Sequence, residues 1–157
     1  MRFPLRLVAL GLGLLGQAAA PLALAALGGD VSSVGADGAR LRAQVRPGTS
    51  TAAGYSVDEL VLTSGTVVNE YISPAGRVFA VSWHGPIKPN LAQLFGTYFQ
   101  SYQAGAKAEA HNSATRRRFT VRQTDLVVES FGRMRAFYGR AYVPSLVPAD
   151  VSVDDIH

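Results

Sequence analysis

Cysteine is absent from this chain of 157 residues. Without thiols the protein can form no disulfide, thiolate metal site or cysteine-linked lipid anchor. Long hydrophobic runs are missing too: the apolar stretch 7–16 is far shorter than the roughly 20 residues that cross a bilayer. The 3 histidines are widely separated and do not have metal-ligand spacing. We therefore expect a fold held by its own packed core, with no metal or other cofactor.

The beginning of the chain indicates export. Arg2 and Arg6 flank the start of the apolar stretch, and small residues follow at Ala23 and Ala25. This arrangement is typical of a cleaved secretory signal, and the lack of a twin arginine favours the general secretory route. We expect residues 1–25 to be removed; the alternative is a signal that is kept as an anchor. The sequence thus predicts a periplasmic or secreted protein, not a lipoprotein, with no transmembrane segment after cleavage.

Net charge gives little support for a nucleic-acid partner. The chain has 15 basic and 11 acidic residues, and losing Arg2 and Arg6 reduces the formal net charge from +4 to +2. No nucleic acid is expected as a partner. The roughly 130 residues that remain suit one domain.

The segment before the main domain, residues 26–54, reads as a weak helix followed by a flexible linker. Apolar residues at helical spacing predict an amphipathic helix over 31–45, which two internal glycines weaken. Residues 47–54 are rich in proline, glycine, serine and threonine and predict the linker. We expect residues 55–157 to form a single domain.

Three β-rich runs open that domain, at 56–63, 66–72 and 77–84, and turn residues separate them. They predict an antiparallel meander. In the third run, Phe79, Val81 and Trp83 alternate with smaller residues, so we expect all three on one bulky, buried face.

The strongest helical pattern follows the meander. Apolar residues recur at the spacing of one helix face, which predicts a helix across the bulky face of the sheet, at Leu91, Leu94, Phe95, Tyr98, Phe99 and Tyr102. Its outer side carries no charge from Asn90 to Gln103 and is a candidate docking surface for a partner protein. A solvated surface of amides and hydroxyls explains the same pattern.

The remaining residues predict a loop over 106–117, a strand over 118–123 and a hairpin. The hairpin strands are 126–131 and 134–143, with the turn at Gly132. The expected fold class is α+β: an antiparallel sheet of about five strands (β-meander, helix, β-hairpin) with one amphipathic helix packed on it.

The order of these motifs is that of a known family. The motifs are Ala26-Leu27-Gly28-Gly29, Ser64-Gly65-Thr66-Val67-Val68-Asn69-Glu70-Tyr71, Gly76-Arg77-Val78-Phe79-Ala80-Val81-Ser82-Trp83, Gly85-Pro86 and Leu94-Phe95-Gly96-Thr97-Tyr98-Phe99. Through them the chain resembles the domain of unknown function 2844 family of small exported proteobacterial proteins, over nearly the whole mature chain. The resemblance implies a Gram-negative cell envelope. It brings no established activity, ligand or catalytic residue.

His84, next to Trp83 at a strand end, is the first candidate for a pocket residue, because a histidine there can act as an acid or base. The alternative is a hydrogen-bonded histidine with no chemistry. Ser64 lies in no nucleophile motif and reads as a turn residue. Glu59 and Glu70 are candidates for a carboxylate pair across strands, although exposed strand carboxylates are the simpler interpretation.

Arginines cluster near the end of the chain, interleaved with aromatic residues. They make a candidate binding surface for polyanions or acidic lipid headgroups, which comprises Arg116, Arg117, Arg118, Arg122, Arg133, Arg135 and Arg140. Cations on exposed strands also block edge-to-edge pairing of sheets, and this is the competing interpretation.

Taken together, these patterns predict a non-enzymatic binding or accessory module of the cell envelope, with an envelope protein as a candidate partner. One alternative is a hydrolase that uses His84 with a carboxylate or Tyr98. Another is a polyanion or membrane-surface binder that uses residues 116–140.

Overall fold

The computed structural model describes residues 27–48, 54–112 and 118–157. The predicted signal peptide, most of the predicted linker, and Arg116 and Arg117 lie outside these ranges.

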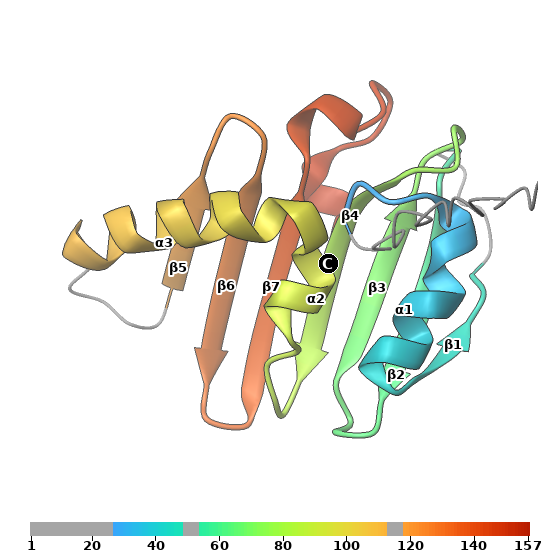
Figure 1. The fold of residues 1–157 in the computed structure, drawn as a ribbon, viewed down its shortest axis with the longest axis horizontal. Helices are drawn as coiled ribbons and strands as arrows, with labels where there is room; N and C mark the ends of the chain where they lie inside the picture. The colour runs from blue at the N-terminus through green and yellow to red at the C-terminus, as the bar shows by residue number, and fades with distance from the viewer. Residues whose placement is uncertain (1–26, 49–53, 113–117) are drawn as a thin grey trace, which may run out of the picture.

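Seven strands form one antiparallel sheet in the order β1-β2-β3-β4-β7-β6-β5. Figure 1 shows the helices on one side of this sheet. The α+β class and antiparallel sheet are confirmed, with seven strands rather than about five. The strands are β1 Ala43–Arg46, β2 Ser56–Leu62, β3 Val67–Ile72, β4 Val78–Gly85, β5 Arg118–Arg122, β6 Val127–Arg133 and β7 Ala136–Tyr142.

The helix expected over 31–45 is shorter than predicted, because its last residues form a strand. A 3-10 turn, η1 (Val31–Ser33), leads into α1 (Val34–Leu41), which ends where Arg42 adopts a left-handed conformation with φ of 51°. β1 then folds back and pairs with β2. α1 lies so close to β1 that position 38 requires glycine, because a Cβ there would overlap the Val45 side chain.

The predicted meander is confirmed as β2, β3 and β4, but the expected alternation along β4 is wrong at one residue. Tyr71 pairs with Ala80 and Ile72 pairs with Val78, so Phe79 is the extra residue of a β-bulge. The bulge turns Phe79 to the opposite face from Val81 and Trp83. The three bulky residues therefore contribute to two different cores.

The predicted helix after the meander is interrupted, and it extends further along the chain than expected. α2 (Leu91–Phe95) is capped by the Asn90 side chain and ends at Gly96, whose φ of 51° breaks the α-helix. A 3-10 turn, η2 (Gly96–Tyr98), leads into α3 (Phe99–Asn112). Much of the stretch predicted as a loop is thus helical, because alanines alternate there with good helix formers.

The C-terminal hairpin is inserted next to the meander, with β7 paired to β4 on one side and to β6 on the other. The hairpin turn lies at Met134 and Arg135, where Arg135 has a φ of 65°, and not at Gly132. Gly132 pairs with Phe137 within the ladder instead. The sheet is therefore continuous from β1 at one edge to β5 at the other.

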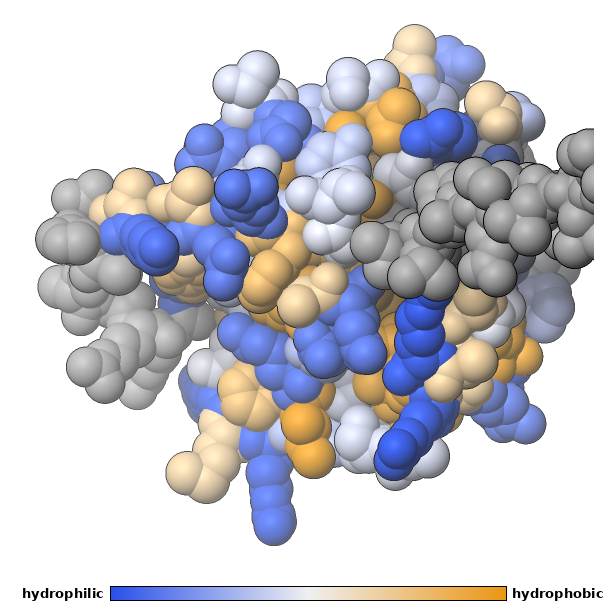
Figure 2. Space-filling view, in the orientation of Figure 1, coloured by the Kyte–Doolittle hydropathy of each residue, from blue (hydrophilic) through white to orange (hydrophobic). Residues whose placement is uncertain are grey.

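Each face of the sheet has its own core. The first face, which we call the helix face, buries Trp83, Val81 and Leu60 under α1, α2 and α3. Figure 2 shows hydrophilic and hydrophobic side chains interspersed on the outside of that layer. The opposite face, which we call the open face, carries Tyr71 and Phe79 under the C-terminal segment 144–157, with its 3-10 turns η3 (Pro144–Leu146) and η4 (Val153–Asp155).

Candidate functional site

The strand register arranges the side chains of the open face in rows that cross the sheet. In the first row, Arg118 lies opposite Phe131, Phe131 opposite Tyr138, and Tyr138 opposite His84. Directly opposed residues of antiparallel strands are close neighbours on one face. The row thus has a cation at one end, two adjacent aromatic rings in the middle and a histidine at the other end.

The aromatic rings of this row are exposed. Phe131 is 37% exposed and Tyr138 is 55% exposed, whereas Trp83, Phe79 and Phe95 are almost completely buried. The guanidinium carbon of Arg118 lies 5.0 Å from the centre of the Phe131 ring, a cation–π contact that holds the charge beside the ring. Aromatic and cationic groups are therefore presented together to solvent.

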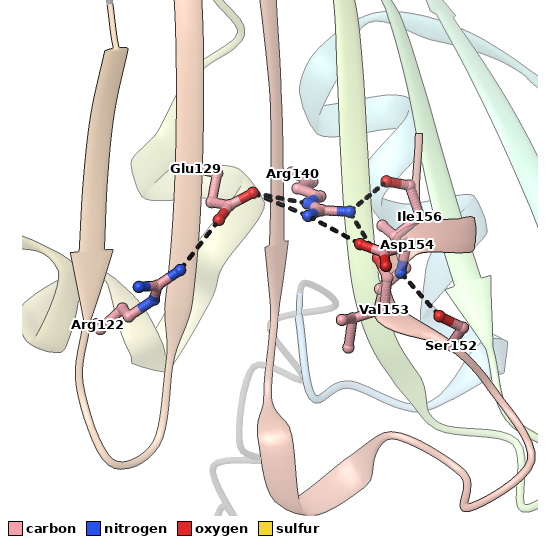
Figure 3. Close-up of polar contacts among 7 residues, drawn as sticks. All are labelled: Arg122, Glu129, Arg140, Ser152, Val153, Asp154 and Ile156. Atoms are coloured by element: carbon pink, nitrogen blue, oxygen red, sulfur yellow. Dashed lines mark hydrogen bonds and ion pairs between the residues drawn. The ribbon is translucent and has the colours of Figure 1, made fainter.

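The second row is ionic. Glu129 lies opposite Arg140, and Arg140 lies opposite Ser82. The Arg140 side chain donates from Nε to Glu129 Oε2 at 2.9 Å, while Arg122 Nη2 lies 3.4 Å from Glu129 Oε1. Figure 3 shows the carboxylate of Glu129 between the two guanidinium groups. Both oxygens of this nearly buried carboxylate are thus neutralised within the protein.

The C-terminal segment covers Tyr71 and Phe79 on the open face and is bonded to the second row. Arg140 Nη1 donates to the Val153 carbonyl oxygen at 2.6 Å, as Figure 3 shows from the side of that segment. At the end of the segment, the His157 carbonyl oxygen accepts from Tyr71 Oη at 2.7 Å and from Ser82 Oγ at 3.0 Å. One side of the open face is therefore covered, while the aromatic row beside it is left uncovered.

A cleft of about 620 Å³ lies between the C-terminal segment and the aromatic row. Its floor comes from β4, β7 and β6, which are interior strands of the sheet. The lining combines aromatic, cationic, acidic and amide side chains, and includes Asn69, His84, Arg118, Glu129, Phe131, Tyr138, Arg140, Asp154 and His157. This is the size and mixture of groups expected of a ligand site.

The two residues that the sequence suggests for a pocket, His84 and Trp83, lie on opposite faces of the sheet. His84 is exposed and lines the cleft. Trp83 is 1% exposed and packs on the helix face against Phe95, with ring centres 6.0 Å apart. Because Gly139 has no side chain, the ring of Trp83 lies against the backbone of β7 and borders the cleft from beneath. The side chain of His84 is thus open to a ligand in the cleft, whereas Trp83 packs beneath the strands that form the floor of the cleft.

The arginine candidates that the structure describes lie in three different places. Arg118 and Arg122 lie on β5 facing the cleft side, and Arg140 is committed to Glu129 and to the C-terminal segment. Arg133 and Arg135 lie at the exposed β6–β7 turn. Arg116 and Arg117 are outside the described residues.

The carboxylate pair considered in the sequence is not formed. Glu59 faces the first strand and makes an exposed ion pair with Arg46 at 3.0 Å. Glu70 lies on the helix face and is fully buried. Ser64 lies in the β2–β3 turn, where its hydroxyl oxygen accepts from the Thr66 amide at 3.4 Å.

Two acids are buried where α1 packs on the sheet: Asp37 of α1, which the sequence analysis does not consider, and Glu70 of β3. Burial raises the pKa of Glu70 to about 8, and the charges of Asp37 and Asp58 add to this effect. Burial likewise raises the pKa of Asp37 to about 7, against the opposing charge of Arg40. Neither oxygen of Glu70 has a hydrogen-bond partner among the described residues. The helix face is therefore built to hold Glu70 in its neutral form at pH 7.

The outer side of α2 and α3 remains exposed at its amide and hydroxyl residues. One of its hydroxyls is engaged within the protein, since Ser101 Oγ donates to Asp125 Oδ2 at 2.7 Å. No feature of the described helices indicates a partner for this surface.

Within the described ranges, no group of three or more histidine, aspartate or glutamate side chains is arranged to hold a metal ion. None of the helices in the same ranges has the length and apolarity needed to cross a membrane.

These features define an α+β protein with one antiparallel sheet, a helix-covered face and a cleft on the other face. The chain belongs to the DUF2844 family, described as a protein of unknown function, whose family model matches residues 23–156. Searches of curated proteins and of solved structures found no match for this chain.

Proposed function

We propose that the protein is an exported, non-enzymatic binding protein of the cell envelope, and that its ligand site is the cleft on the open face. The observation that carries this proposal is the pair formed by Phe131 and Tyr138, which lie opposite each other and are both exposed at the cleft. The support for export is the signal-like pattern of residues 1–25.

Exposed neighbouring aromatic rings favour a binding role. Burying an aromatic ring stabilises a protein, and the same sheet buries Phe79 and Trp83 almost completely. The exposure of Phe131 and Tyr138 therefore forgoes this stabilisation, which favours a role for the two rings in binding. Apolar surface left open beside polar groups is typical of interaction sites. The C-terminal segment covers Tyr71, whereas Tyr138 is 55% exposed and available to a ligand.

The ionic row argues for binding over hydrolysis. A hydrolase that uses His84 would need a carboxylate or hydroxyl free to move a proton. Two acidic residues line the cleft. Glu129 has both oxygens held by Arg140 and Arg122, and Asp154 lies 3.7 Å from Arg140. Glu129 is the acid on the floor of the cleft. Its geometry suits a fixed structural charge rather than a general base.

Binding of 8-anilinonaphthalene-1-sulfonate, a fluorescent aromatic anion, tests the site. We expect one saturable site on the folded protein, and Tyr138→Ala should weaken binding roughly tenfold or more because it removes a stacking ring. Ile87→Ala, which trims an exposed apolar side chain outside the cleft lining, should leave binding unchanged. Equal affinity in the wild type and Tyr138→Ala would contradict the proposal.

A further inference from the structure

The charges around the cleft are unequally neutralised. Glu129 is shared by two arginines, and Arg140 is satisfied by Glu129 and the C-terminal segment. Among the described residues Arg118 makes no ion pair; its contact is with the Phe131 ring. The exposed acid of the lining, Asp154, lies 3.7 Å from Arg140 and is not part of the aromatic row. The row itself therefore offers a ligand one uncompensated positive charge, which complements an anionic group.

The polar groups beside the rings include both donors and acceptors. Arg118 and His84 stand at the two ends of the row, and Asn69 and Asp154 lie along the cleft. Planar side chains of these types suit ligands whose neighbouring hydroxyl groups both donate and accept hydrogen bonds. The exposed rings suit a ligand that also has a flat apolar face. Pyranose rings have both properties.

The row is long enough for more than one ring. From β5 to β4 it crosses three strand spacings, about 14 Å in all. The exposure of Tyr138 shows that the row is open to solvent rather than enclosed. A chain of linked rings therefore fits this row better than a single small molecule.

Two other classes of chain fit less well. An extended peptide binds a sheet by pairing with a free edge, but β4, β7 and β6 each have strand neighbours on both sides. A single-stranded nucleic acid would stack its bases on the rings, but it carries a phosphate at every unit. The aromatic row offers one arginine, Arg118, and the exposed carboxylate of Asp154 lines the same cleft.

We propose that the cleft binds an acidic sugar chain, with sugar rings stacked on Phe131 and Tyr138 and a carboxylate held by Arg118. This inference rests on the proposed binding function and specifies its ligand class. His84 and Asn69 then bond the hydroxyl groups of the rings.

A glycan array that contains neutral, uronic-acid and sialylated chains, with single-stranded oligonucleotides spotted beside them, provides the test. The full mature protein should bind carboxylate-bearing glycans in preference to neutral ones. Tyr138→Ala should reduce all glycan binding roughly tenfold or more. Arg118→Gln should remove the preference for acidic chains, since it deletes one charge-assisted hydrogen bond. Lys88→Gln, which removes an exposed charge outside the cleft lining, is the matched control.

Three results would overturn the inference: no glycan bound, neutral chains bound as well as acidic ones, or binding confined to the oligonucleotides. If the anilinonaphthalene probe still binds in a Tyr138-dependent manner, such a result removes the sugar ligand and leaves the binding site in place. If the probe fails as well, the proposed function falls with it.

Discussion

Glu129 and Arg140 lie directly opposite each other on β6 and β7, and the guanidinium of Arg140 joins Glu129 to the carbonyl oxygen of Val153. This single side chain therefore connects the sheet to the C-terminal segment that forms one wall of the cleft. Glu129 is 7% exposed, so its charge depends on the arginines for compensation.

Replacing Arg140 tests that connection. We expect Arg140→Met to lower the free energy of unfolding by about 3 kcal/mol, because it leaves a buried carboxylate with only the longer contact to Arg122. Chemical denaturation measures this change. Arg46→Met, which breaks the exposed pair with Glu59, should cost at most about 1 kcal/mol.

The double variant Glu129→Met with Arg140→Met refines the test. It should be more stable than Arg140→Met alone, since it removes the uncompensated charge together with its partner. Additive losses would show that the two residues do not act as a pair.

Gly139 makes room for the Trp83 ring, and Gly139→Ala should therefore destabilise the protein. An added Cβ would overlap the indole. Overpacking of this kind costs roughly 1–3 kcal/mol, and Trp83, the only tryptophan, should report it through altered fluorescence. Gly35→Ala is the control: a Cβ there meets nothing within 4 Å, and helix propensity favours alanine. Equal effects of the two substitutions would contradict the packing account.

Glu70 should make stability depend on pH. Its folded pKa of about 8 lies above the ordinary value of 4.5, so the folded state holds a proton that the unfolded state releases between these limits. The free energy of unfolding should thus fall as pH rises from about 4.5 to about 8. Asp37 adds to the same trend up to about pH 7.

Glu70→Gln isolates this contribution. At pH 5 it should match the wild type, and at pH 9 it should be more stable by on the order of 2–4 kcal/mol, because no buried carboxyl has to ionise. Thermal unfolding across pH measures the difference. A parallel pair of curves for wild type and variant would contradict the assignment. The control Glu59→Gln, which weakens only the exposed ion pair with Arg46, should change the free energy of unfolding by at most about 1 kcal/mol.

If residues 1–25 act as a cleaved export signal, the mature protein should lack them. Mass spectrometry of the protein recovered from the cell envelope should find a mature start at Ala26, after the small residues Ala23 and Ala25. An intact Met1 would contradict cleavage. Recovery of the protein from the cytoplasmic fraction would contradict export itself.

Local patterns were enough to predict most strands. The meander and the hairpin were found from alternation and turn residues, and the helix from its apolar periodicity, because these depend on neighbouring residues. The sequence does not predict β1, because a strand of four residues carries too little pattern. Nor does it predict the break at Gly96 or the bulge at Phe79, because a single residue changes the backbone direction in each case.

The cleft cannot be predicted from the sequence for a different reason. His84 and Tyr138 become neighbours only because β7 is inserted beside β4, a pairing between distant segments. The same applies to Arg118, which meets Phe131 only in the correct register of β5 on β6. Once that register is known, the row of aromatic and cationic groups follows directly.

Mapping the binding surface by backbone-amide chemical shifts tests the central claim most directly. When the anilinonaphthalene probe is titrated into the mature protein, the account predicts shifts at the cleft-lining positions of β3 to β7 and in the C-terminal segment, centred on Tyr138. Shifts confined to the helix face, at α1, α2 and α3, would contradict it.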